Sequence, residues 1–173
     1  MSLSNSLPQK DLESVNLYLK KVLIDHFNGK ELLQDACDIS NASVEKLYTK
    51  AYEFYQAGDS LGAINAFGLL IHVDPFSQVF WMGLGSARQL NSEHEKALQA
   101  FAIAALLDDQ DPAPHYHAAQ NYLALNNEED ALKALDLAEA LSTMSAMHAP
   151  FQERVAKLKG YYYQTYKGSY GNR

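Results

Sequence analysis

The segment Phe80 to Gln89 constrains the fold of this chain more than any other stretch. It contains Trp81, the single tryptophan, with Leu84 three positions later and Gly85 four positions later. On an α-helix these spacings place the three residues on one face. We expect Trp81 and Leu84 to reach a partner helix. Gly85 has no side chain, so we expect the backbone of that helix to come close there. The segment therefore predicts a tightly packed helix pair.

The same pattern recurs along the chain with the 34-residue period of the tetratricopeptide repeat, a helix–turn–helix unit that opens with W-x-x-L-G. The equivalent positions are Leu47, Trp81 and His115; Ala51, Gly85 and Ala119; Ala63, Ala97 and Ala131; Phe67, Phe101 and Leu135. Recurrence at four offsets is improbable by chance, which disfavours the alternative of an unrelated helical bundle. We therefore predict an all-α tetratricopeptide solenoid. Its three repeats are expected at about 44–77, 78–111 and 112–145.

Helix ends follow from turn residues and prolines between the apolar stretches. We expect turns at Gly58-Asp59, Asn91-Ser92 and Asn126-Asn127. The expected repeat helices are 43–57, 60–72, 76–90, 93–107, 113–125 and 128–141. A further helix after Pro150 carries Phe151, Val155, Leu158 and Tyr162 on one face. This helix would cover the open end of the last repeat, which solenoids need for solubility. The C-terminal segment 146–173 is therefore expected to be a cap and tail.

The N-terminal segment, 1–43, is expected to be a helix and a linker that precede the repeats at 44–145. Helical spacing of apolar residues predicts an amphipathic helix at about 9–28. The residues of its main apolar stripe are Leu12, Val15, Leu19 and Val22. Two interpretations stay open: the helix packs as a cap on the first repeat, or it joins two chains into a homodimer.

The composition indicates which kinds of binding partner and which cellular compartment are expected for this chain. Hydrophobic residues make up 47% and charged residues 20%, with a net charge of −7, which is typical of a globular acidic protein. The negative charge disfavours nucleic acid and anionic membrane surfaces as partners. The longest apolar run, Ala100 to Leu107, is far below the roughly 20 residues of a membrane span. The N-terminus carries no secretory signal pattern, and the single cysteine, Cys37, favours a reducing cytoplasm.

Enzymatic and metal-binding patterns are weak in this sequence. His115 and His117 are two positions apart on a predicted helix, which points their rings to opposite sides, unlike the i, i+4 pairs that bind metals. His115 also occupies the position of Trp81 and is expected to be packed. There is no phosphate-binding glycine loop, nucleophile elbow or C-x-x-C pair. We expect no enzyme activity, no metal and no cofactor.

Binding by this chain is expected on the first helix of each repeat, which lines the concave side of such a solenoid. The candidate groove residues are Tyr48, Tyr52, Tyr55, Met82, Ser86, Gln89, Tyr116 and Gln120. Tyrosine and methionine give a soft, nearly uncharged surface suited to apolar peptide anchors. The alternative is that the tyrosines only pack between helices. No Lys or Arg stands at these positions, which excludes the repeat class that captures a C-terminal carboxylate.

Three blocks of the sequence resemble the class II chaperones of bacterial type III secretion. They are Leu47 to Gly58, Phe80 to Gln89 with its F-x-x-G-L-G-x-x-R-Q pattern, and Pro114 to Ala119 with its H-A-A block. The likeness covers about residues 43–141 and a helix on each side. Arg88 stands where the repeat usually has a tyrosine, a substitution that the family shares.

The resemblance implies a cytoplasmic bacterial protein that holds a hydrophobic translocator subunit before export. It implies that the concave groove binds an N-terminal segment of the translocator and that the N-terminal helix mediates dimerisation. The physical chemistry of burial agrees with this function, because an apolar groove removes an aggregation-prone segment from water. Each Å² of apolar surface buried contributes about 25 cal/mol, before the entropy cost of ordering the segment is subtracted. The alternative function is a general tetratricopeptide scaffold in a cytoplasmic assembly.

Overall fold

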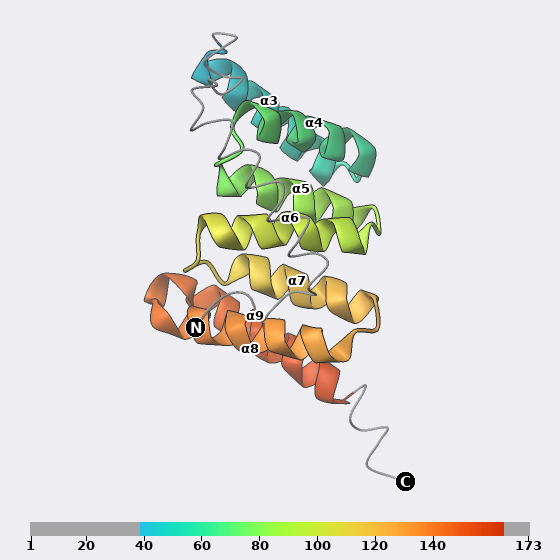
Figure 1. Cartoon of the computed structure of the whole chain (residues 1–173), viewed down its shortest axis with the longest axis vertical. Helices are drawn as coiled ribbons and strands as arrows, with labels where there is room; N and C mark the ends of the chain where they lie inside the picture. Colours follow the sequence, from blue (N-terminus) through green and yellow to red (C-terminus); the bar gives the residue numbers. More distant parts are fainter. Residues whose placement is uncertain (1–38, 165–173) are drawn as a thin grey trace, which may run out of the picture. The chain divides into compact units, whose positions relative to one another are not determined.

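The computed structural model describes residues 39–164, and every regular element among them is helical (Figure 1). The predicted N-terminal helix at 9–28 and Cys37 lie outside the described residues. The elements are α3 (Asn41–Gln56), α4 (Ser60–Val73), α5 (Gln78–Leu90), α6 (His94–Leu107), α7 (Ala113–Ala124), α8 (Glu128–Met144), the 3-10 helix η2 (Ala146–His148) and α9 (Ala149–Tyr162). The all-α tetratricopeptide class predicted from the sequence is confirmed.

The chain divides into two compact units at Asp108 and Asp109. In the first unit, α3 packs on α4, α4 on α5, and α5 on α6. In the second unit, α7 packs on α8, and α8 packs on α9. The first unit thus holds the first two predicted repeats, and the second unit holds the third repeat and the C-terminal helix.

Sharp turns join the two helices of each repeat, and their strained residue recurs with the predicted period. Gly58, Ser92 and Asn126 have φ angles of 76°, 59° and 58°, in the left-handed region that glycine and asparagine tolerate best. The residue after the first turn, Asp59, caps α4 by accepting a hydrogen bond from the Gly62 amide at 2.9 Å. The predicted turns are therefore confirmed.

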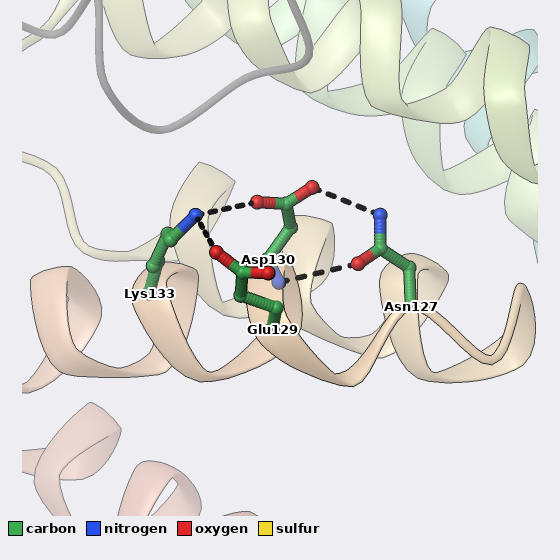
Figure 2. Close-up of polar contacts among 4 residues, drawn as sticks. All are labelled: Asn127, Glu129, Asp130 and Lys133. Atoms are coloured by element: carbon green, nitrogen blue, oxygen red, sulfur yellow. Dashed lines mark hydrogen bonds and ion pairs between the residues drawn. The ribbon is translucent and has the colours of Figure 1, made fainter.

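The N-terminus of α8 shows this capping most fully (Figure 2). Asn127 Oδ1 accepts a hydrogen bond from the Asp130 amide at 3.3 Å, and Asn127 Nδ2 donates to Asp130 Oδ2 at 2.9 Å. Lys133 adds ion pairs to Glu129 at 2.8 Å and to Asp130 at 3.1 Å. Carboxylates in the first turn also favour the positive end of the helix dipole. These contacts hold the start of α8 in place.

Helix ends differ from the expected ones by up to three residues. Helix α5 begins at Gln78 instead of Phe76, because the Asp74 carboxylate accepts a hydrogen bond from the Phe76 amide at 3.0 Å and holds a turn there. Helix α8 continues to Met144, beyond the expected end at 141. The uncharged Leu141–Thr143 stretch carries no residue that would stop a helix.

Burial follows the 34-residue period. The small positions Ala51, Ala63, Ala97, Ala119 and Ala131 and the large positions Phe67, Phe101 and Leu135 are all buried. Trp81 is buried in the core of the first unit, and its indole Nε1 donates a hydrogen bond to the Pro75 carbonyl at 2.8 Å. The tryptophan therefore packs the core and fastens the turn that precedes its own helix.

Two glycines of α5 make room for aromatic rings. A Cβ atom on Gly85 would lie 2.6 Å from the ring of Phe101 on α6. The atoms nearest to that position belong to the Phe101 side chain, a contact that the sequence reasoning did not predict. A Cβ atom on Gly83 would collide with the ring of Phe67 on α4, a contact that the sequence reasoning missed. Each ring thus lies against a helix surface that only glycine leaves open.

In the second unit, α9 covers one side of α8, as the sequence predicted. Val155 and Tyr162 of the predicted face are buried, and Phe151 and Leu158 are half-buried. The Tyr162 hydroxyl donates a hydrogen bond to Glu128 at 2.9 Å, and Lys159 pairs with Asp136 at 2.7 Å. Apolar burial along the helix and polar contacts at its C-terminal end therefore fix α9 on α8.

Candidate functional site: an apolar hollow between α3 and α5

An open hollow of about 520 Å³ lies in the first unit between the first helices of its two repeats. Its lining residues are Val44, Glu45, Tyr48, Thr49, Ser77, Val79 and Phe80. Four of these side chains are apolar or aromatic, which gives the hollow the chemistry of a site for an apolar anchor.

Helix α3 supplies one wall because Val44 and Tyr48 lie one turn apart and so share a face. Helix α5 supplies the other wall in its first turn, where Val79 is 50% exposed and Phe80 is half-buried. The ring of Tyr48 lies edge-on to Phe67 with centroids 6.1 Å apart, and tilted to Phe80 at 5.9 Å. Tyr48 therefore packs on the core and lines the hollow at once.

The polar groups of the hollow are few. Ser77 precedes α5 as its N-cap residue, but its side chain makes no capping hydrogen bond. The Thr49 hydroxyl donates to the Glu45 carbonyl at 2.9 Å, a bond within the turn of α3. Glu45 is the one charged residue among those that line the hollow. The lining thus offers hydroxyl groups and one carboxylate but no cation.

Tyr52 and Tyr55, the other two candidate groove tyrosines of the first unit, lie further along α3. Tyr52 is 48% exposed, and its ring stacks on Tyr55 with centroids 6.3 Å apart and an interplanar angle of 29°. Tyr55 and Met82 are half-buried against the core of the first unit. Ser86 and Gln89 are half-buried on α5. Of the six predicted groove residues in this unit, only Tyr48 lines the hollow.

The two remaining predicted residues lie together on α7 in the second unit. Tyr116 is half-buried and edge-on to Phe151 of α9, with centroids 6.0 Å apart. Gln120 Nε2 donates to the Tyr116 hydroxyl at 3.4 Å. Phe151, expected only as a packing residue, thus holds the ring of a predicted groove residue in position.

His115 is packed, as predicted, and is 5% exposed. Burial lowers its pKa to about 4, while the nearby Asp111 carboxylate acts in the opposite direction. Its Nε2 atom is buried without a hydrogen-bond partner, whereas Trp81 at the equivalent position bonds to Pro75. Burial also lowers the pKa of His117. Both imidazoles are therefore neutral at physiological pH.

Residues 39–164 contain no group of three or more His, Cys, Asp and Glu side chains that could hold a metal ion. Over the same residues, no helix has the length and apolar character that crossing a membrane requires.

Apart from Tyr48, the residues of the hollow were not among the candidate site residues; they are Val44, Glu45, Thr49, Ser77, Val79 and Phe80. Val44 could have been found, because it stands four residues before Tyr48 on the same helical face. Ser77 and Phe80 carried no such signal, since their position against α3 depends on how α5 packs.

Helix pairs with a 34-residue period and an apolar hollow between their first helices define a tetratricopeptide protein that binds other proteins. No family model matches the chain. It is 28% identical over 121 residues to the low calcium response locus protein H of Yersinia pestis, which covers 70% of this chain and 72% of that relative.

Solved structures give the closer comparison of folds. The chain is 30% identical to PcrH in complex with the chaperone binding region of PopB, with a TM-score of 0.67, over 69% of this chain and 96% of PcrH. PcrH is a Pseudomonas aeruginosa protein that has also been solved with the chaperone binding region of PopD.

A second solved relative is SycD, the type III secretion chaperone of Yersinia enterocolitica, in complex with a peptide of the translocator YopD. It is 27% identical with a TM-score of 0.58, over 70% of this chain and 98% of SycD. SycD has also been solved in an alternative dimer. The chain belongs to the class II chaperones of type III secretion, the translocator chaperones.

Proposed function

We propose that this chain binds a hydrophobic translocator subunit of a type III secretion system and holds it before export. The observation that carries the proposal is the apolar hollow between α3 and α5, with Tyr48 in its wall. The proposal is supported by PcrH and SycD, which were solved with segments of PopB, PopD and YopD.

The physical reason is the same for any protein that must later enter a membrane. Its apolar segments aggregate in water, and a chaperone prevents this by burying them. Burying one large aliphatic side chain contributes about 1.5–3 kcal/mol before the cost of ordering the peptide. A hollow that takes one or two anchors therefore gives a modest affinity, which suits a protein that must release its cargo.

The other candidate residues extend this binding surface in the proposal. Tyr52, Tyr55, Met82, Ser86 and Gln89 would contact the segment beyond the hollow in the first unit. Tyr116 and Gln120 would bind a further part of it in the second unit. Tyrosine suits this role because it offers a large contact area with few rotatable bonds.

The same proposal assigns roles to the three segments of the chain. Residues 44–145 bind the translocator, and 146–173 cap the last repeat. Residues 1–43 join two chains through Leu12, Val15, Leu19 and Val22, in keeping with the dimer forms of SycD. The protein acts in the bacterial cytoplasm without catalysis, cofactor or nucleic acid.

The test is co-purification with a matched pair of variants. Val79→Glu places a charge in the hollow, and Leu61→Glu places the same charge at the second residue of α4, outside the hollow. Both side chains are at least half exposed, at 50% and 62%, so neither change disturbs the core.

The full chain is tagged and expressed beside its neighbouring genes, and bound proteins are identified by mass spectrometry. We expect wild type and Leu61→Glu to retain a membrane-inserting secreted protein that Val79→Glu loses. Retention of only water-soluble cytoplasmic partners, equally by all three proteins, would contradict the proposal and favour a general scaffold.

A further inference from the structure

The hollow between α3 and α5 carries a charge of one sign only. Of its seven lining residues, Glu45 is the single ionisable group apart from the Tyr48 phenol, and no Lys, Arg or His is among them. An apolar ligand segment seated there would meet a carboxylate at the rim and no compensating cation. This asymmetry is the starting point for an inference that rests on the proposed function.

The Glu45 carboxylate is not neutralised within residues 39–164. The Thr49 hydroxyl bonds to the backbone carbonyl of Glu45, not to its side chain. No ion pair of this part of the chain includes Glu45. The carboxylate is exposed and therefore available to a ligand.

The nearest lysines of α3 lie on the other flank of the helix. Lys46 and Lys50 line a second hollow of about 350 Å³ but not the apolar one, and Glu45 and Thr49 border both. Lys50 pairs there with Glu53 at 3.0 Å. The apolar hollow thus keeps its negative rim.

We propose that Glu45 is a specificity-determining residue of this chaperone. The hollow takes an apolar anchor that has a lysine or arginine within two residues of it, and it disfavours an anchor with aspartate or glutamate there. The cation pairs with Glu45, while an acidic residue is repelled and finds no partner among the lining residues.

The expected size of the preference is modest because the pair is exposed to water. Ion pairs of this kind change an equilibrium constant by about two- to five-fold, and a reversed charge changes it more. The net charge of −7 favours basic ligands in general, but salt screens that effect beyond about 8 Å at physiological ionic strength. A control variant must therefore separate Glu45 from the overall charge.

The experiment is a selection from a random 12-residue peptide display library on the immobilised full chain. Wild type, Glu45→Gln, Glu45→Lys, Glu53→Lys and Val79→Glu are used in parallel. Glu53→Lys is the matched control, since it makes the same charge change on the same helix outside the apolar hollow. Far-UV circular dichroism verifies that every variant is folded.

We expect wild type and Glu53→Lys to select apolar peptides with Lys or Arg next to the anchor. Glu45→Gln should lose this preference, and Glu45→Lys should replace it with Asp or Glu. For the best wild-type peptide, changing its basic residue to glutamine should weaken binding about two- to five-fold, and only when Glu45 is present.

Two outcomes distinguish the inference from the proposed function. If all proteins except Val79→Glu select apolar peptides with the same charge pattern, the role of Glu45 is refuted and the hollow remains the binding site. If Val79→Glu selects the same apolar peptides as wild type, or if no apolar peptide is enriched at all, the proposed binding site itself fails and the inference fails with it.

Discussion

Acidification should destabilise the second unit through His115, whose imidazole is buried and neutral. Its pKa is about 4 in the folded protein, against an ordinary value of 6.5. The unfolded chain therefore takes up a proton near pH 6.5, whereas the folded chain does not until about pH 4. The contribution of neutral His115 to the free energy of unfolding is therefore complete above pH 6.5 and is lost as the pH falls from 6.5 to 4.

The magnitude follows from the difference between the two pKa values. Each pKa unit corresponds to about 1.4 kcal/mol, so full protonation would cost about 3 kcal/mol, and the loss between pH 7 and pH 5 is about 2 kcal/mol. That is a large share of the 5–15 kcal/mol by which domains are typically stable.

The assay is urea denaturation at pH 7 and pH 5, followed by far-UV circular dichroism. His115→Phe keeps an apolar ring of similar size and removes the titrating group. We expect the variant to lose about 2 kcal/mol less than wild type between the two pH values. Matching far-UV circular dichroism spectra of wild type and His115→Phe at pH 7 are the control that the variant keeps the fold. Equal pH dependence in wild type and His115→Phe would refute the reasoning.

Four further predictions concern packing, capping, binding and assembly. Gly85→Leu should destabilise the chain by about 1–3 kcal/mol in urea denaturation, because its side chain would overlap the ring of Phe101; an unchanged midpoint would contradict the close contact. Tyr162→Phe should cost about 1 kcal/mol by removing the hydrogen bond to Glu128, and an unaffected thermal midpoint would count against that bond. Tyr52→Ala should weaken binding of a selected peptide by about 1–3 kcal/mol in calorimetry while the fold is kept. Unchanged affinity would show that Tyr52 does not belong to the peptide-binding surface. Deletion of residues 1–28 should give a smaller species in light scattering, and a full-length chain that is already monomeric at high micromolar concentration would exclude the dimer.

The repeat pattern was readable from the sequence because each repeat uses the same local geometry. Helical periodicity at Trp81, Leu84 and Gly85, repeated every 34 residues, predicted which positions are buried. Left-handed turns recur at the same offset because a tight helix–helix connection needs one residue with positive φ. Local chemistry was sufficient for these features, since neighbouring residues decide where helices begin, end and turn.

Packing partners could not be read in the same way. The sequence predicted a close approach of the partner helix at Gly85, but not that the ring of Phe101 is the nearest group there. Likewise, it assigned Tyr48, Tyr52 and Tyr55 to one groove, whereas Tyr48 lines the hollow and the stacked Tyr52–Tyr55 pair is not among its lining residues. Side-chain contacts of this kind depend on the angle and distance between helices, which helical periodicity does not contain.

The 34-residue period and the helical spacing of residues were enough to identify a tetratricopeptide protein whose first helices carry an apolar, nearly uncharged surface. The packing of the helices was needed to show that part of this surface forms an open hollow between α3 and α5, with Glu45 as the single carboxylate of its lining. The two walls of the hollow lie about one repeat apart in the sequence. The hollow and its charge therefore form only when Ser77 to Phe80 pack opposite Val44 to Thr49.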